Sequence, residues 1–143
     1  MRIAQVAPLA ESVPPRMYGG TERVVHRLTE ELVHRGHEVA LFASGDSRTS
    51  SRLIPGCPRA LRLDDRLYES AACHAAEVDM VRARAPEFDI IHNHIGEYAF
   101  SFARDSGTPV VTTTHGRLDL PRVRFVYESF PDVPLVSISN AQR

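Results

Sequence analysis

The sequence has few of the features that mark secreted, membrane-spanning or nucleic-acid-binding proteins. It contains only two cysteines, Cys57 and Cys73, without CxxC spacing, which favours a reduced, cytoplasmic protein over a disulfide-stapled one. Lysine is absent, and the 17 basic residues are balanced by 18 acidic ones, for a formal net charge of −1. A chain without excess positive charge has no general attraction for nucleic acid or for an anionic membrane surface.

Long apolar runs are also missing. No stretch approaches the roughly 20 residues needed to cross a bilayer, and the first residues read as a strand rather than as a signal peptide. We therefore expect no membrane span. The chain has 143 residues, of which 43% are hydrophobic. This length suits a single domain with a sizeable core and is too short for two full α/β domains.

Short apolar runs alternate with amphipathic segments along the chain. Strands are expected at residues 2–7, 38–43, 88–94, 109–115 and 134–139. Helices are expected at residues 21–35, from Leu67 to Ala85, at 97–105 and at 122–130, with the first turn of another at 140–143. The polar stretch 44–58 is interpreted as a loop. This alternation predicts an α/β fold with a doubly wound parallel sheet.

A pair of adjacent glycines, Gly19 and Gly20, precedes the first predicted helix. Glycine lets the backbone adopt a positive φ and approach a ligand without a Cβ atom in between. Thr21 is the expected N-cap, and the free N–H groups of the first helical turn attract anions together with the helix dipole. The stretch predicts either a phosphate-binding helix start or a plain tight turn into a helix.

Polar residues follow each of the first four predicted strands. In open parallel sheets, ligands bind beyond the carboxyl ends of the strands. The residues expected there are Gly19 and Gly20 after the first strand, Asp46 after the second, His94 after the third, and His115 and Gly116 after the fourth. Their convergence at one edge of the sheet favours a ligand site more strongly than any single motif does.

Two other kinds of site are alternatives. A dinucleotide site needs G-x-G-x-x-G directly after the strand and an acidic residue at the end of the next one. Here the glycines come late and lack a third, and only Asp46 could serve as the acid. A metal site could use His92, His94 and His115, because the histidines of a His-x-His strand point to one face. Neutral histidines that hydrogen-bond a polar ligand, or purely structural histidines, are the other interpretations.

Several short motifs occur together in a characteristic order. They are Gly-Gly-Thr-Glu-Arg at 19–23, Gly-His-Glu-Val at 36–39, His-Asn-His at 92–94, Thr-His-Gly at 114–116 and Val-Ser-Ile-Ser-Asn at 136–140. In this order and spacing the chain resembles, over essentially its whole length, the N-terminal domain of family 4 retaining glycosyltransferases, which have the GT-B fold. The resemblance implies that residues 1–143 form one Rossmann-like domain. It also implies that this domain is the acceptor-side half of an enzyme that transfers a sugar from a nucleotide-diphosphate-sugar donor.

The resemblance implies roles for individual residues as well. Gly19 and Gly20 would approach the diphosphate of the donor, and His115 would face the transferred sugar as the catalytic residue. The acceptor side would be lined by Tyr18, Asp46, His94 and Gly116. No metal ion or other cofactor is implied.

The sequence departs from the family because the C-terminal donor-binding domain, with its E-x7-E motif, is absent from it. We therefore expect little or no transferase activity from this chain alone. Its expected partners are the sugar donor, an unidentified acceptor and a C-terminal glycosyltransferase half. The open face that would meet this half could instead support a homodimer. The alternative function is a non-catalytic Rossmann-like module for binding or assembly, although the intact Gly19, Gly20 and His115 argue against it.

Overall fold

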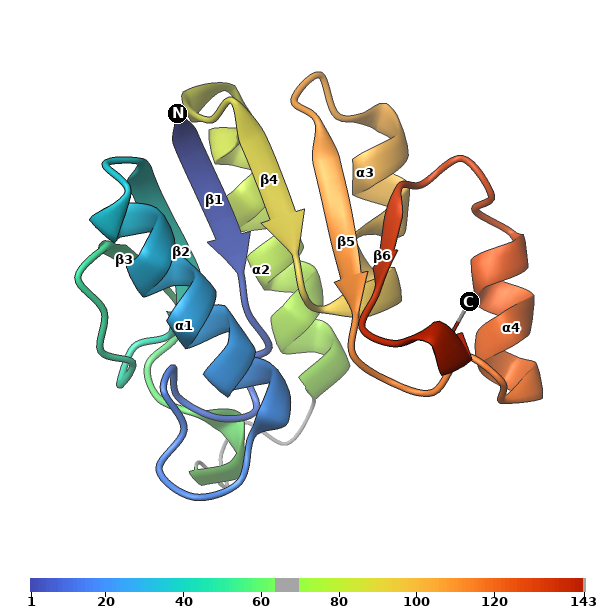
Figure 1. Ribbon diagram of the computed structural model, residues 1–143, viewed down its shortest axis with the longest axis horizontal. Coiled ribbons are helices and arrows are strands. Elements are labelled where there is room, and N and C mark those ends of the chain that lie inside the picture. The colour runs from blue at the N-terminus through green and yellow to red at the C-terminus, as the bar shows by residue number, and fades with distance from the viewer. Residues whose placement is uncertain (64–69, 143) are drawn as a thin grey trace.

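The structure is a computed structural model that describes residues 1–63 and 70–142, which form a parallel sheet between helices (Figure 1). Within these residues six strands are hydrogen-bonded in the order β3-β2-β1-β4-β5-β6, and each pair of neighbours is parallel. The strands are Arg2–Val6 (β1), Glu38–Ser44 (β2), Arg52–Cys57 (β3), Ile90–Asn93 (β4), Val110–Thr114 (β5) and Leu135–Ser137 (β6). The predicted parallel sheet is confirmed.

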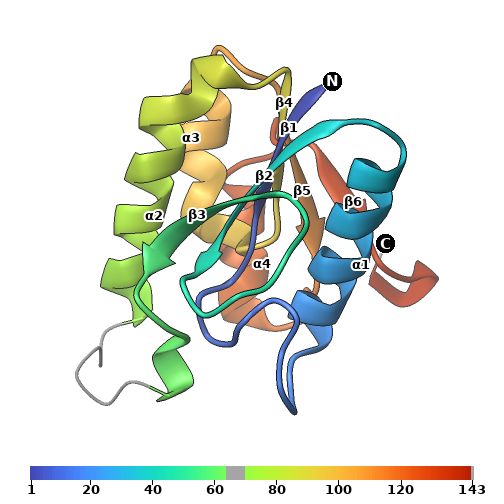
Figure 2. The same cartoon turned by 90° about the vertical axis from the view of Figure 1, so that its left-hand side faces the viewer.

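Four α-helices accompany the strands in the described part of the chain. They are Gly20–His34 (α1), Ser70–Arg84 (α2), Phe100–Asp105 (α3) and Pro121–Glu128 (α4). Figure 2 shows α1 on one face of the sheet and α2 and α3 on the opposite face. Helices on both faces of a parallel sheet make the doubly wound, Rossmann-like arrangement that the sequence predicts. None of the helices in residues 1–63 and 70–142 is long and apolar enough to cross a membrane.

Two apolar clusters hold the sheet against its helices. The larger cluster lies between the sheet and α2 and α3, and it contains Phe42 and Ile91. Phe42 also meets Phe88 edge to face, with 6.0 Å between the ring centroids. The smaller cluster lies between the sheet and α1, and it contains Val25 and Leu41. Burying one such side chain stabilises the fold by about 1.5–3 kcal/mol relative to leaving it exposed. The two clusters therefore stabilise the central strands from both faces.

The edge strand β3 corrects the sequence prediction, which placed a loop over residues 44–58. β3 pairs with β2, and the register shifts between Ala43 and Ser44. It contains Pro55 and Gly56, which usually indicate a loop. Proline is tolerated in a strand at the edge of a sheet, because the hydrogen bond that it cannot donate is not needed on the open side.

Three segment boundaries also differ from the prediction. α1 begins at Gly20 with Gly19 as its N-cap and without a side-chain cap, so the prediction of Thr21 as N-cap is wrong. The predicted helix 97–105 divides into a 3-10 turn, Gly96–Ala99, followed by α3. The predicted helical turn at the end of the chain is a 3-10 turn, Asn140–Gln142. The predicted start of the second helix, Leu67, lies outside the described residues.

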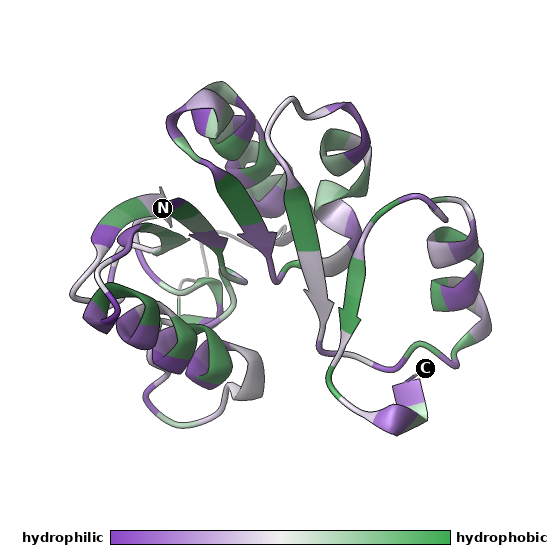
Figure 3. Ribbon diagram, turned by 45° about the horizontal axis from the view of Figure 1, so that its top comes forward, coloured by the Kyte–Doolittle hydropathy of each residue, from purple (hydrophilic) through white to green (hydrophobic). Residues whose placement is uncertain are grey.

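The residues of the central strands change from apolar to polar along each strand. In β4, Ile90 and Ile91 are followed by His92 and Asn93, and in β5 two valines are followed by three threonines. Figure 3 shows β4 changing from hydrophobic green to hydrophilic purple toward its carboxyl end, and β5 changing from green to nearly white. The polar residues of the central strands therefore gather at the edge of the sheet where parallel folds bind ligands.

Candidate functional site

A cavity of about 520 Å³ opens at the carboxyl edge of the sheet. It lies between the loop after β1, the start of α1, the 3-10 turn Leu61–Leu63 and the ends of β5 and β6. The structure thus brings four residues that the sequence singles out to the wall of one cavity, namely Tyr18, Gly19, Gly20 and His115.

The two glycines of the turn have different surroundings. Gly19 has a φ of +146°, and a Cβ atom on it would lie 2.8 Å from both Glu22 Oε2 and Pro15 Cβ. A Cβ atom on Gly20 would have no other atom within 4 Å. Gly19 is therefore needed for the conformation of the turn, whereas Gly20 leaves open space at the first turn of α1.

Charged residues that the sequence analysis does not assign to the site also line the cavity. Glu11 and Glu22 are both buried, and Glu11 forms an ion pair with Arg62 at 2.8 Å. The guanidinium carbon of Arg62 lies 5.5 Å from the centroid of the Tyr18 ring. Burial raises the pKa of Glu22, and the nearby Glu11 raises it further, while its own backbone N–H and Arg62 act in the opposite direction. Because Arg62 is already paired, it offers little free positive charge to a phosphate.

Three histidines form a chain of contacts beneath the cavity wall. His94 Nδ1 lies 3.0 Å from His115 Nε2, and His94 Nε2 lies 2.8 Å from Gln5 Oε1. The ring of His92 lies 4.1 Å from that of His94 between centroids, and its Nε2 lies 2.7 Å from Thr113 Oγ1. The rings of His92 and His94 share one face, as His-x-His spacing in a strand predicts.

Burial favours the neutral form of all three histidines. Burial, together with His92 and His115, lowers the pKa of His94 to about 2. Burial, together with His115, lowers the pKa of His92 to about 4. Burial also lowers the pKa of His115. In residues 1–63 and 70–142, no group of three or more His, Cys, Asp or Glu side chains could hold a metal ion. His92 and His94 hydrogen-bond protein groups, as structural histidines do, whereas His115 also lines the cavity.

The remaining predicted site residues lie around this cavity rather than in its wall. Asp46 Oδ1 accepts hydrogen bonds from Ser44 Oγ at 2.7 Å and from the Ala60 N–H at 2.9 Å, so it ties the loop after β2 to the loop after β3. His94 lies behind His115 and is only 4% exposed. Gly116 lines a second hollow, of about 800 Å³, to which His115 also contributes. His115 thus separates two neighbouring hollows.

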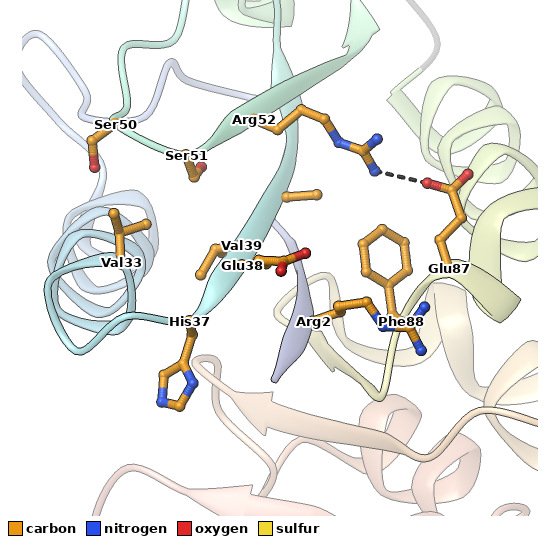
Figure 4. A pocket seen from close by; sticks show the side chains of 11 residues that line it. Arg2, Val33, His37, Glu38, Val39, Ser50, Ser51, Arg52, Glu87 and Phe88 are labelled. Atoms are coloured by element: carbon orange, nitrogen blue, oxygen red, sulfur yellow. Dashed lines mark hydrogen bonds and ion pairs between the residues drawn. The ribbon is translucent and has the colours of Figure 1, made fainter.

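A cavity of about 530 Å³ lies at the opposite edge of the sheet, near the amino ends of β1, β2 and β3. Figure 4 shows its charged side chains, among them an Arg52–Glu87 pair at 2.8 Å. Arg2, which also lines it, is paired with Asp89 at 2.7 Å. None of the residues that the sequence assigns to a site lies there, and ligands of parallel sheets bind at the other edge. The carboxyl edge is therefore the better candidate.

Solved structures of glycosyltransferases have similar folds. AviGT4, a glycosyltransferase involved in avilamycin A biosynthesis, matches with a TM-score of 0.61 and 23% identity, over 95% of this chain and 41% of that one. Sucrose-phosphate synthase from Thermosynechococcus elongatus matches with a TM-score of 0.62 and 15% identity, over 94% and 41%. MurG from Acinetobacter baumannii matches with a TM-score of 0.62 and 11% identity, over 99% and 43%. The chain thus spans about two fifths of the length of these structures.

Sequence comparisons identify the family. No curated protein sequence gave a significant match. The model of the family described as Glycosyltransferase Family 4 matches residues 18–136, a range that includes the glycine turn, the three histidines, all of β2 to β5 and the first two residues of β6. Together with the fold, which corresponds to one half of a GT-B structure, this match shows that the chain belongs to glycosyltransferase family 4.

Proposed function

We propose that this chain is the acceptor-side half of a retaining glycosyltransferase, which uses a nucleotide-diphosphate-sugar donor and an acceptor that is still to be identified. The observation that carries the proposal is the placement of Gly19, Gly20 and His115 around one cavity at the carboxyl edge of the sheet. In this proposal the two glycines face the donor diphosphate and His115 faces the transferred sugar. Tyr18 and Gly116 lie beside His115, toward the acceptor.

The start of α1 suits a leaving diphosphate. The diphosphate gains negative charge as the bond to the sugar breaks, so fixed N–H dipoles that point at it stabilise the transition state more than the ground state. The open space at Gly20 lets a phosphate come close to the free N–H groups of the first turn. The hydroxyl groups of the sugar are suitable hydrogen-bond partners for a neutral histidine such as His115.

The same cavity also supports the need for a second half. A helix terminus contributes about 0.3–1 kcal/mol to anion binding at an exposed site, and up to about 2 kcal/mol when partly buried. Arg62 is paired with Glu11, and Glu22 is a further carboxyl group in the wall. Further positive charge must therefore come from outside the described cavity residues, and we assign it to a donor-binding half.

Exposed apolar side chains beside the cavity fit an interface with that half. Tyr18 is 75% exposed and Ile138 is 56% exposed, and both line the cavity. Large apolar side chains that gather around a cavity in this way are typical of a binding surface. A second copy of the chain on this face is the alternative occupant, and the oligomeric state in sedimentation distinguishes the two.

Titration of the isotope-labelled chain with UDP-glucose, GDP-mannose and inorganic pyrophosphate tests the proposed donor side. We expect weak binding, with a Kd of about 1–10 mM, and amide shifts confined to the Gly19–Glu22 turn and the surroundings of His115. Ser50, Ser51 and Arg52 line the cavity at the opposite edge and should not respond. Shifts centred on those three residues, or no shift with any of the three ligands at about ten times that concentration, would contradict the proposed site.

A further inference from the structure

The hydrogen-bond partners of His94 determine which nitrogen of His115 carries its proton. Two neutral imidazoles that meet nitrogen to nitrogen, as His94 and His115 do at 3.0 Å, share one proton between them. His94 is 4% exposed, and both of its ring nitrogens are engaged, one by His115 and the other by Gln5. It therefore has no access to a proton from bulk water, and its own tautomer is set by its two partners.

Gln5 presents its carbonyl oxygen to His94. With the Gln5 amide oriented so that Oε1 lies 2.8 Å from Nε2 of His94, this oxygen can only accept, so His94 Nε2 carries a proton. In the same orientation Nε2 of Gln5 is buried without a hydrogen-bond partner among the described residues, and an amide turned the other way would reverse the assignment. Nδ1 of the neutral His94 is then an acceptor. Because Nδ1 accepts, the proton between the two rings belongs to Nε2 of His115. The second nitrogen of His115, Nδ1, is left with a lone pair.

We infer that Gln5 and His94 are positioning residues, which hold His115 in the tautomer with its proton on Nε2 and leave its Nδ1 as a hydrogen-bond acceptor for the ligand. No described residue makes a hydrogen bond to Nδ1 of His115 that would occupy it. Gln5 is fully buried in β1, where it pairs in register with His92 of β4. The position of His94 is also fixed, because its backbone N–H donates to the Val6 carbonyl at 2.9 Å. Hydrogen bonds of its backbone N–H and of both ring nitrogens therefore hold His94 in place.

This tautomer restricts what can bind against His115. A lone pair attracts a group that donates a hydrogen bond, such as a sugar hydroxyl, and repels an anionic phosphate oxygen. If the proposed function is correct, His115 selects a hydroxyl of the transferred sugar, and the diphosphate is directed to the N–H groups of the glycine turn. The assignment of the sugar to one side of the cavity and of the diphosphate to the other thus rests on the proposed function, whereas the tautomer does not.

Nitrogen NMR spectra of the histidine side chains in the full, ligand-free chain test the inference. At neutral pH we expect the His115 Nε2 resonance in the range of protonated ring nitrogens and the Nδ1 resonance in the range of unprotonated ones. A proton on Nδ1 of His115, or averaged resonances that indicate two exchanging tautomers, would overturn the inference. Because no donor is added, this result is independent of whether the chain binds a nucleotide sugar.

Gln5→Met tests whether the hydrogen-bond chain is the cause of the tautomer. Methionine has a similar shape and lacks the acceptor, so the resonances of His115 should shift toward a mixture of tautomers. An unchanged tautomer in Gln5→Met would show that Gln5 does not set it. Amide spectra show whether the variant is folded, and the wild-type spectrum remains decisive if it is not.

Discussion

Replacing Glu77 by methionine is expected to raise the free energy of unfolding at neutral pH by about 1–3 kcal/mol. Glu77 lies on α2 and is 0% exposed, and neither of its carboxyl oxygens has a hydrogen-bond partner among the described residues. The side chain packs tightly near Gly56, where a Cβ atom would lie 3.2 Å from Glu77 Oε1. Methionine has a similar length and carries no group that needs a partner, so it removes the desolvation cost without leaving a large void.

The gain in the free energy of unfolding from Glu77→Met should increase with pH. Burial raises the pKa of Glu77 well above its ordinary value of 4.5, so the folded chain keeps a proton that the unfolded chain loses above that pH. Folding then takes up a proton, and stability falls by up to about 1.4 kcal/mol per pH unit as the pH rises from the unfolded pKa to the folded pKa. Glu77→Met should remove this part of the pH dependence.

Urea unfolding followed by circular dichroism, from about pH 5 to about pH 8, measures both effects. Asp79→Asn is the matched control, because Asp79 lies exposed on the same helix, and its replacement should change stability by no more than about 0.5 kcal/mol. A Glu77→Met chain that loses stability with rising pH as steeply as the wild type does would show that Glu77 is not the buried proton-binding group.

The second large effect is expected at the glycine turn, where Gly19→Ala should destabilise the chain by about 1–3 kcal/mol. The new methyl group would lie 2.8 Å from Pro15 and Glu22, and the backbone would keep a φ of +146°, which alanine rarely adopts. Gly20→Ala is the matched variant, because its methyl group meets no other atom within 4 Å and stands in the first turn of a helix. We expect its stability to stay within about 1 kcal/mol of the wild type.

The two glycine variants also separate folding from binding. Gly20→Ala should fold as the wild type does, yet place a methyl group where we propose that the diphosphate approaches, so its response to UDP-glucose and GDP-mannose should weaken. Thermal unfolding and the same NMR titration measure the two quantities. Equal stability losses for the two variants would contradict the structural difference between the glycines. An undiminished ligand response in Gly20→Ala would move the diphosphate away from the turn.

The buried strands could be predicted from the sequence because their apolar runs reflect burial on both faces. The edge strand β3 could not, since Pro55 and Gly56 are acceptable only at an open edge, and nothing local shows that residues 52–57 lie there. Thr21 is a good N-cap by residue type, but the N-cap of α1 lies two residues earlier than this prediction. The structure instead uses the backbone of Gly19, with its positive φ, as the cap.

The candidate site was predictable where it follows from topology. The carboxyl ends of parallel strands meet at one edge, so Gly19, Gly20 and His115 were expected together, and they line one cavity. The Glu11–Arg62 pair was not predictable, because it joins the loop after β1 to the 3-10 turn Leu61–Leu63, which only the tertiary fold brings together. In the sequence, Gln5 is a single polar residue in an otherwise apolar strand. Its hydrogen-bond connection to His115 through His94 can be recognised only when the register of β1 and β4 is known.

Transfer of sugar to an acceptor, measured with and without a donor-binding half, tests the central claim most directly. The chain would be assayed alone and fused after residue 143 to the C-terminal half of a family 4 transferase, with UDP-glucose and GDP-mannose as donors. We predict turnover only in the fused protein, with the anomeric configuration retained, and a loss of about 10²–10³-fold in kcat for His115→Ala. Robust transfer by the isolated chain would contradict the half-enzyme account. Turnover of the fused protein that is unchanged by His115→Ala would contradict the role proposed for His115 and favour a non-catalytic module.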